Sequence, residues 1–209
     1  MSDQAVAFKP ELCFEGKSLT TDWTSKYLVT WMGILAPLRD ASLSILEVGS
    51  WEGRSALFFL NFLPHSKIVC VDTFEGSSEH HGWPLERRLS QLSGIERRFD
   101  QNIAEFAGRV EKYKENSLLA LGRLGLANRR FDLIYIDGSH LAVDVYRDGV
   151  LAWPLLVPGG ILIFDDYIFP VGPEHEQPHV GIDAFLGTIK NRYIELVRGH
   201  QIIVSKVEG

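Results

Sequence analysis

Carboxylate side chains end two apolar runs of the sequence, and their spacing predicts a shared site. Asp137 ends the run at residues 131–137, and Asp165 and Asp166 end the run at residues 160–166. Neither run alternates polar and apolar residues, so each predicts a strand buried on both faces of a parallel sheet. Because consecutive parallel strands are usually neighbours, we expect the three carboxylates to converge at one edge of the sheet.

A divalent cation would relieve the repulsion among these carboxylates. Clustered carboxylates raise each other's pKa, and hard oxygen ligands favour Mg²⁺ over Mn²⁺ or Ca²⁺. The sequence therefore predicts Asp137, Asp165 and Asp166 as metal ligands. In the alternative interpretation, Asp137 caps the following helix and the other two acids bind loop amides.

A histidine stands three residues after the first of these acids. An imidazole at this place can take a proton from a substrate hydroxyl near neutral pH, so His140 is predicted as a general base. Metal ligation and helix capping are the two alternatives. We assign His140 and Asp137 to the catalytic centre.

A glycine turn follows an earlier apolar run, at residues 44–49, and opens a predicted helix. Its spacing is G-x-x-x-G with an acid two residues before the first glycine, not the G-x-G-x-x-G of dinucleotide sites. This pattern is poorly suited to binding a pyrophosphate and favours a ligand without phosphate groups. A simple strand–helix turn is the alternative. The predicted ligand contacts here are Glu47, Gly49, Ser50, Gly53 and Ser55.

An acid at the end of the next apolar run supports a nucleoside site. Asp72 lies 23 residues after Gly49, where a carboxylate can accept both hydroxyls of a ribose. Thr73 and Phe74 follow, and the ring of Phe74 is expected against an adenine face. Asn116 and Ser117 come after a probable third strand and are expected near the adenine edge. A turn or helix cap is the alternative for Asp72 and Asn116.

Apolar runs and helical segments alternate along the chain, which predicts a doubly wound, mostly parallel α/β sheet with helices on both faces. The expected strands are residues 44–49, 67–72, 110–114, 131–137 and 160–166, with a closing antiparallel pair at 193–197 and 201–204. The expected helices are residues 22–38, 54–63, 85–107, 117–126 and 140–156. Two irregular segments, 73–84 and 167–178, leave the carboxyl ends of strands and are predicted to be substrate loops.

Composition narrows the class of protein. The 209 residues are 45% hydrophobic and 23% charged, which excludes disordered, collagen-like and coiled-coil classes. A net charge of −6 gives no support for a nucleic-acid partner. No apolar run is long enough to span a membrane, and the first residues lack the form of a signal peptide. We expect one cytoplasmic domain over residues 1–209, with a helical segment at 1–40 and the core at 41–209.

The chain resembles the metal-dependent O-methyltransferases related to macrocin O-methyltransferase in four stretches. In chain order, these are LEVGSWEGRSA, VDTFEG, FDLIYIDGSH and VPGGILIFDDY. This family belongs to the class I S-adenosylmethionine (SAM)-dependent group. The resemblance implies a seven-stranded sheet, SAM and Mg²⁺ as cofactors, and methyl transfer to a hydroxyl of a small molecule such as a sugar, a natural product or a phenol. It assigns Glu47, Gly49, Gly53 and Asp72 to SAM, and Asp137, Asp165 and Asp166 to the metal.

The sequence departs from the related catechol-type enzymes at two positions. Those enzymes have a lysine three residues after the first metal acid and an asparagine as third ligand, where this chain has His140 and Asp166. The departure favours the macrocin-like branch. Two other functions stay open, a dinucleotide-dependent oxidoreductase and a catalytically silent methyltransferase-like binding protein. A homo-oligomer also stays open.

Overall fold

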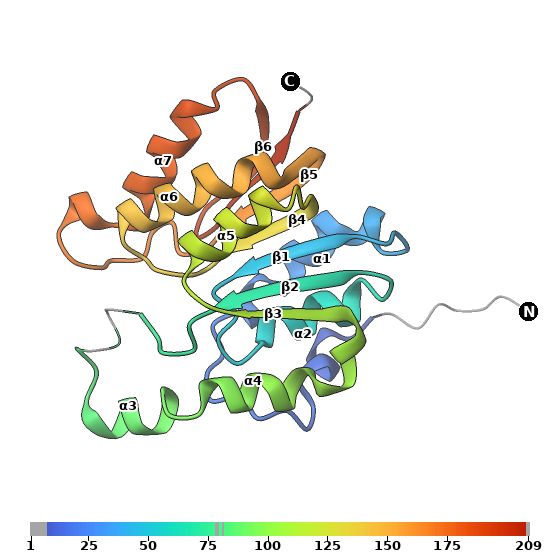
Figure 1. The fold of residues 1–209 in the computed structure, drawn as a ribbon, viewed down its shortest axis with the longest axis vertical. Helices are drawn as coiled ribbons and strands as arrows, with labels where there is room; N and C mark the ends of the chain where they lie inside the picture. Colours follow the sequence, from blue (N-terminus) through green and yellow to red (C-terminus); the bar gives the residue numbers. More distant parts are fainter. Residues whose placement is uncertain (1–7, 78–79, 81, 208–209) are drawn as a thin grey trace, which may run out of the picture.

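A seven-stranded sheet forms the centre of the computed structural model, which describes residues 8–77, 80 and 82–207. The strands follow the order β3-β2-β1-β4-β5-β7-β6 across the sheet. The first five are parallel, and β7 and β6 close the sheet with antiparallel pairing (Figure 1). The doubly wound, mostly parallel sheet predicted from the sequence is confirmed. The strands are β1 (Ser44–Val48), β2 (Lys67–Asp72), β3 (Val110–Lys114), β4 (Phe131–Ile136), β5 (Leu156–Phe164), β6 (Tyr193–Arg198) and β7 (Ile202–Lys206).

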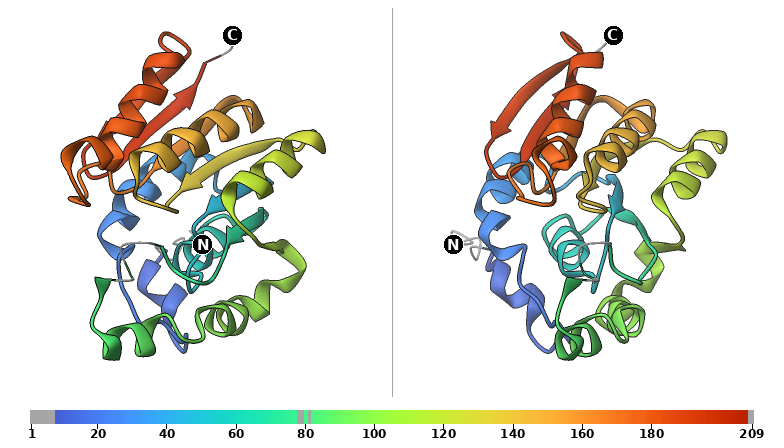
Figure 2. Two further views of the ribbon diagram at one scale, coloured as in Figure 1. Left: turned by 60° about the vertical axis from the view of Figure 1, so that its left-hand side comes forward. Right: turned by 90° about the vertical axis from the view of Figure 1, so that its left-hand side faces the viewer.

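Helices cover both faces of the sheet. Helices α5, α6 and α7 lie over one face, and α1, α2 and α4 lie over the other (Figures 1 and 2). Neighbouring strand residues bury their side chains on opposite faces, as Ile45 and Leu46 do, because side chains alternate along a strand. The α-helices of the described residues are α1 (Leu28–Leu35), α2 (Arg54–Phe62), α3 (Leu85–Gln91), α4 (Ile95–Ile103), α5 (Ser117–Leu126), α6 (Ala142–Ala152) and α7 (Pro178–Thr188).

The segment before β1 packs onto the sheet. Short 3-10 turns at Ser25–Tyr27 and Ala36–Leu38 flank α1. Trp31 is fully buried and donates its indole N–H to Gln201 Oε1 at 2.8 Å, beside the start of β7. The helical region thus begins later than the predicted residue 22, since the Asp22 side chain accepts the Ser25 amide. Trp23 therefore stays outside the helix and 42% exposed.

Three elements differ from the sequence-based expectation. Strand β5 starts before residue 160, because an irregular register against β4 accommodates the Pro-Gly-Gly segment within the strand. The single helix expected at 85–107 is broken at Gly94, whose φ of +78° ends one helix and begins another. Helix α7 was not expected; it begins at Pro178, where a proline without an amide hydrogen fits the first turn.

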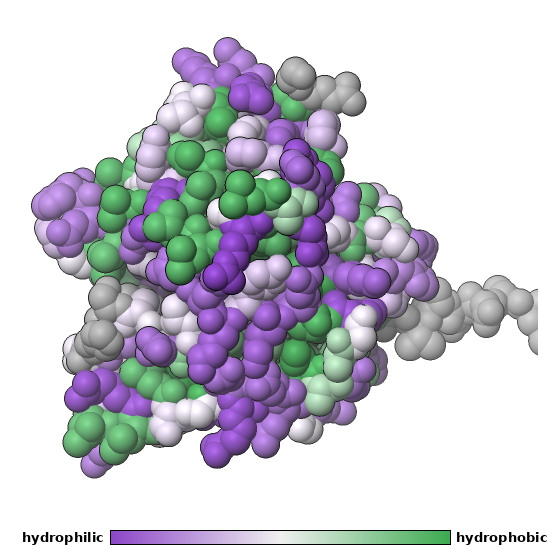
Figure 3. Space-filling model, in the orientation of Figure 1, coloured by the Kyte–Doolittle hydropathy of each residue, from purple (hydrophilic) through white to green (hydrophobic). Residues whose placement is uncertain are grey.

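The outer surface of α5 and α6 carries apolar side chains, which gather on the face shown in Figure 3. Leu119 is 57% exposed and Val143 is 69% exposed. None of the described helices has both the length and the apolar character needed to cross a membrane.

Candidate active site

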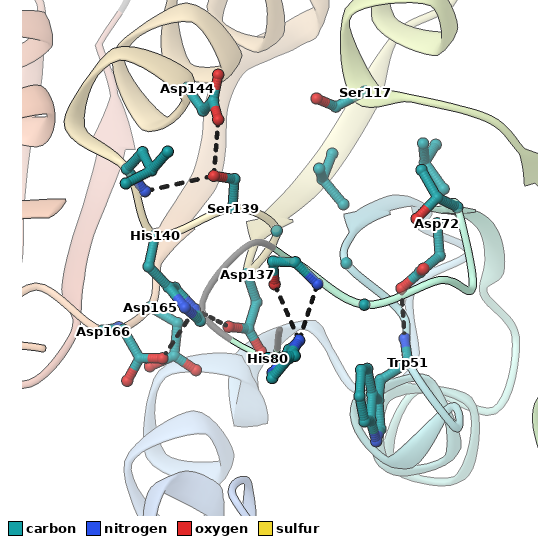
Figure 4. Close-up of a pocket in the computed structure, with 18 of the residues that line it drawn as sticks. Trp51, Asp72, His80, Ser117, Asp137, Ser139, His140, Asp144, Asp165 and Asp166 are labelled. Atoms are coloured by element: carbon teal, nitrogen blue, oxygen red, sulfur yellow. Dashed lines mark hydrogen bonds and ion pairs between the residues drawn. The ribbon is translucent and has the colours of Figure 1, made fainter. Parts of the chain in front are cut away.

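A cavity of about 640 Å³ opens at the carboxyl ends of β1, β2, β4 and β5. This is the edge where open α/β sheets bind ligands. Figure 4 shows Asp137, His140, Asp165 and Asp166 gathered on one side and Asp72 with Trp51 on the other. The sequence-predicted residues that line the cavity are Gly49, Asp72, Thr73, Asn116, Ser117, Asp137, His140, Asp165 and Asp166.

Gly49 brings the glycine turn against the end of β4. Its φ is +88°, and a Cβ atom at this position would lie 1.9 Å from the carbonyl oxygen of Asp137. Its amide donates to the Val71 carbonyl at 2.8 Å. Any other residue would push β1 and β4 apart, so this glycine fixes the distance between the turn and the acids of the cavity.

Trp51 occupies a left-handed conformation between the two glycines of the turn, with φ at +47°. Such a conformation is rare for a bulky residue and marks local strain. Its amide donates to Asp72 Oδ2 at 2.7 Å, and the residue lines the cavity. Trp51 is not among the residues predicted from the sequence, because the local pattern does not show that its side chain reaches the cavity.

Asp72 joins the glycine turn to the loop after β2. Its Oδ2 accepts the Trp51 amide, and its Oδ1 accepts the Phe74 amide at 2.5 Å. Burial raises the pKa of Asp72, while these amide bonds oppose that shift. The Ser50 amide also hydrogen-bonds to this carboxylate. Two carboxylate oxygens have about four lone-pair positions in all, so the side chain keeps acceptor capacity for a hydroxyl group from the cavity. The side chain therefore fits a ribose hydroxyl.

Five other predicted cofactor residues lie behind the cavity wall. None of Glu47, Ser50, Gly53, Ser55 and Phe74 is among the lining residues. Glu47 is fully buried, and burial raises its pKa to about 7. A Cβ atom at Gly53 would lie 3.1 Å from the ring of Phe99 in α4, and the ring of Phe74 packs against the same ring at 5.1 Å. These residues shape the turn, and their direct contact with a ligand stays a prediction.

Asn116 and Ser117 line the cavity at the start of α5 and also hold that helix in place. Asn116 Oδ1 caps the helix by accepting the Leu118 amide at 2.8 Å. Ser117 donates its hydroxyl to Asp148 Oδ1 at 2.8 Å, and burial raises the pKa of Asp148 to about 6. Capping, one of the two interpretations of Asn116, is thus what the structure shows directly.

Asp137, His140 and Asp166 form a compact group of possible metal ligands. One ligand atom from each lies within 4.8 Å of the others. His140 Nε2 is 3.1 Å from Asp166 Oδ2 and 3.6 Å from Asp137 Oδ1. Asp166 has a φ of +53°, a conformation that turns the chain directly after β5. Asp137 does not cap α6, whose N-cap is Leu141 without a side-chain bond.

Asp165 lies beside this group and is largely buried. Its Oδ1 accepts the Asp166 amide at 2.7 Å, and its Oδ2 accepts the hydroxyl of Tyr135. The same hydroxyl oxygen is 2.8 Å from Asp137 Oδ2. Burial, followed by the charge of neighbouring acids, raises the pKa of both Asp137 and Asp165. The three acids lie close together, as expected. His140 belongs to the compact ligand group, and Tyr135 donates a hydrogen bond to Asp165.

The segment before β1 and both irregular loops reach the cavity. Trp23 and Lys26 come from the N-terminal segment, Ser77 and Trp83 from the loop after β2, and Phe169 from the loop after β5. Burial and the nearby charges of Asp165 and Asp166 raise the pKa of Tyr27, which places its phenol near the acids. The predicted substrate loops therefore border the cavity in the part of the chain that is described.

The strand order and the cavity at the carboxyl edge define a class I methyltransferase fold. Residues 46–167 match the family described as methyltransferase domain, so the chain belongs to that family. This membership confirms the resemblance found in the sequence and disfavours the dinucleotide-dependent oxidoreductase.

Three proteins of similar sequence or structure are methyltransferases by name. The mycinamicin VI 2''-O-methyltransferase of Micromonospora griseorubida is 27% identical over 135 residues, which are 61% of this chain and 28% of that protein. A mycinamycin methyltransferase solved with Mg, SAH and mycinamycin VI has a TM-score of 0.62 at 17% identity, covering 90% of this chain and 51% of that one. A putative caffeoyl-CoA O-methyltransferase from Staphylococcus aureus has a TM-score of 0.63 at 16% identity, covering 96% and 93% of the two chains.

The chain therefore spans about a quarter of the curated relative and about half of the solved mycinamycin enzyme. The solved structures, all below 25% identity, establish the shared fold.

Proposed function

We propose that this chain is a SAM-dependent O-methyltransferase that uses a divalent cation, with Mg²⁺ favoured, to methylate a hydroxyl of a small molecule. One observation carries the proposal. The same cavity contains Asp72, suited to a ribose, and the ligand group of Asp137, His140 and Asp166. Similar proteins that are named as O-methyltransferases, and similar structures that hold SAH with Mg or SAM, support it.

The residues present fit both cofactors. Asp72 keeps acceptor capacity for a ribose, and the turn at Gly49 presents no phosphate-binding pattern. Asp137 and Asp166 supply hard oxygen ligands, His140 supplies a nitrogen, and burial among like charges favours a cation at this place. Asp165 is the further predicted ligand, held next to the group by the Asp166 amide.

The chain's own residues would align the acceptor and manage its proton. A hydroxyl is a poor nucleophile until it loses its proton, and a bound divalent cation supplies Lewis acidity that makes this loss easier. His140 Nε2, directed toward Asp166 and Asp137, is placed to accept that proton or to ligate the cation. Asp137 lies next to His140 in either role. Binding donor and acceptor in the same cavity would bring them into the alignment that methyl transfer needs.

Calorimetry with SAM and a metal titration test this proposal. We expect the wild-type protein to bind SAM, as measured by calorimetry. We also expect it to bind Mn²⁺, as measured by electron paramagnetic resonance, and we expect Mg²⁺ to compete with Mn²⁺ for the site. Asp166→Ala should weaken Mn²⁺ binding by at least about tenfold, since a charged ligand is lost, and leave SAM affinity within about twofold. Asp40→Ala, which changes an exposed acid away from the cavity, is the matched control.

Turnover separates the enzyme from a silent binding protein. S-adenosylhomocysteine release should appear with Mg²⁺ and an acceptor from a panel of phenols, sugars and macrolide-like alcohols, and should stop with EDTA. Absence of SAM binding would refute the proposal, and NAD binding in its place would support the oxidoreductase. SAM binding with unchanged metal affinity in Asp166→Ala would remove the assigned metal site.

The finer predictions from the sequence complete this proposal. We place the protein in the cytoplasm as one domain over residues 1–209, with no nucleic-acid partner, and leave a homo-oligomer open. Fractionation of cells and light scattering on the purified chain test these points.

A further inference from the structure

The cavity has an aromatic wall that the proposed chemistry does not use. The rings of Trp23 and Trp51 lie 5.3 Å apart, and those of Trp23 and Trp83 lie 6.5 Å apart. The three indoles come from the N-terminal segment, the glycine turn and the loop after β2, so three separate parts of the chain meet here. The imidazole of His80 packs among the three indoles, stacked on Trp23 and 4.2 Å from the centroid of Trp83. The parts of Trp23, Trp51 and Trp83 that line the cavity offer rigid apolar contact to a ligand.

Two cations line the same cavity, and each lies over an aromatic ring. The guanidinium of Arg87 lies over the Trp83 ring, 3.7 Å from its centroid, and Lys26 Nζ lies 4.6 Å from the centroid of the Tyr27 ring. Both residues line the cavity and both are exposed. A cation over a ring is held in place by the ring's quadrupole, while its outer N–H groups stay available to an anion.

Neither cation is neutralised by a neighbouring acid. Across the described parts of the chain, no carboxylate oxygen lies within 4.0 Å of the charged nitrogens of Lys26 or Arg87. Arg147, the other arginine of the cavity, differs because it pairs with Asp144 at 3.0 Å. Arg87 Nε donates to Gln91 Oε1 at 3.2 Å. Among the described residues, the two positive charges have no carboxylate partner, and they stand in a cavity whose other charged residues are mostly acids.

We propose, on the basis of the proposed function, that the methyl acceptor carries a carboxylate or phosphate group beside a flat ring. Trp23 and Trp83 give the acceptor rigid apolar contact at the cavity, and Lys26 and Arg87 bind the anionic group. Without these cations, the acids of the cavity would repel an anionic acceptor. The arginine fork suits the two oxygens of a carboxylate or phosphate. The acceptor hydroxyl then faces Asp137, His140 and Asp166.

Binding of matched probes tests this subsite without knowledge of the natural acceptor. With SAH and Mg²⁺ present at saturation, Kd is measured from quenching of tryptophan fluorescence and from calorimetry. The carboxylate pair is 3,4-dihydroxycinnamate and its methyl ester, and the phosphate pair is uridine 5′-diphosphate and uridine. We expect at least one anion to bind about tenfold more tightly than its neutral counterpart. The pair that shows the preference identifies the anionic group.

The variant Lys26→Met/Arg87→Gln should abolish this preference while leaving the affinity of the neutral probe within about twofold. Arg97→Gln, an exposed arginine on α4 outside the cavity, is the control and should behave as wild type. Equal affinity for charged and neutral members of both pairs would overturn the proposal, as would a preference that survives in the double variant. SAH affinity tests the proposed function, and thermal unfolding tests whether the variants fold. Both are measured without an acceptor probe, so their failure can be told apart from failure of the anion subsite.

Discussion

Replacing Glu47 by glutamine should remove a pH-dependent loss of stability from this protein. The Glu47 carboxyl is fully buried beneath the glycine turn, and burial raises its pKa from 4.5 to about 7. Ser50, Ser55 and Cys70 oppose the shift through hydrogen bonds without cancelling it. The folded state therefore keeps its proton on Glu47 over a pH range in which the unfolded chain releases it.

The sign and size of the effect follow from this difference. Below pH 4.5 the carboxyl is neutral in both states, so its burial carries no charge penalty. As the pH rises from 4.5 to about 7, the free energy of unfolding falls by about 1.4 kcal/mol per pH unit. The total loss is about 3 kcal/mol and is complete above pH 7. Glutamine has no proton to lose, so its variant avoids this decline.

Urea unfolding followed by tryptophan fluorescence measures the difference at pH 5, 6, 7 and 8. The advantage of Glu47→Gln over wild type should grow from pH 5 to about pH 7 and level off by pH 8, whatever constant offset the amide introduces. Glu15→Gln, at an exposed position, should run parallel to wild type. A constant difference between Glu47→Gln and wild type at all four pH values would refute the argument. An unchanged SAM affinity in the variant would show that Glu47 shapes the turn without contacting the cofactor.

Two further substitutions test the proposed ribose contact of Asp72 and the buried ion pair that holds the glycine turn. Asp72→Ala should weaken SAM binding by at least about tenfold in calorimetry, because it removes charged acceptors for the ribose; an affinity within twofold of wild type would contradict this role. Arg98 of α4 forms a buried ion pair with Glu52 of the glycine turn, so Arg98→Leu should lower the free energy of unfolding by about 3–5 kcal/mol by removing the partner of a buried carboxyl group. Adding Glu52→Gln should restore part of that loss in the same urea titration, and no recovery would contradict the buried-charge explanation.

Local sequence patterns predicted the strands that carry the site. Uninterrupted apolar runs placed Asp72 at the end of β2 and Asp137 directly after β4, because only strands buried on both faces lack alternation. The spacing of apolar residues did not predict the break at Gly94 or the helix that starts at Pro178. Both features depend on the backbone conformation at a single residue, which apolar spacing does not record. The missing amide hydrogen of Pro178 suits the first turn of α7.

The sequence by itself determined which chemical groups meet at the carboxyl edge, because parallel strands deliver their last residues to one edge whatever lies between them. The tertiary structure decided which groups face the cavity. It set Trp51 on the wall and Phe74 behind it, and it put Tyr135 between two acids. It also brought Lys26 to the same cavity from the N-terminal segment. These placements depend on contacts between residues far apart in the chain, which local periodicity does not record.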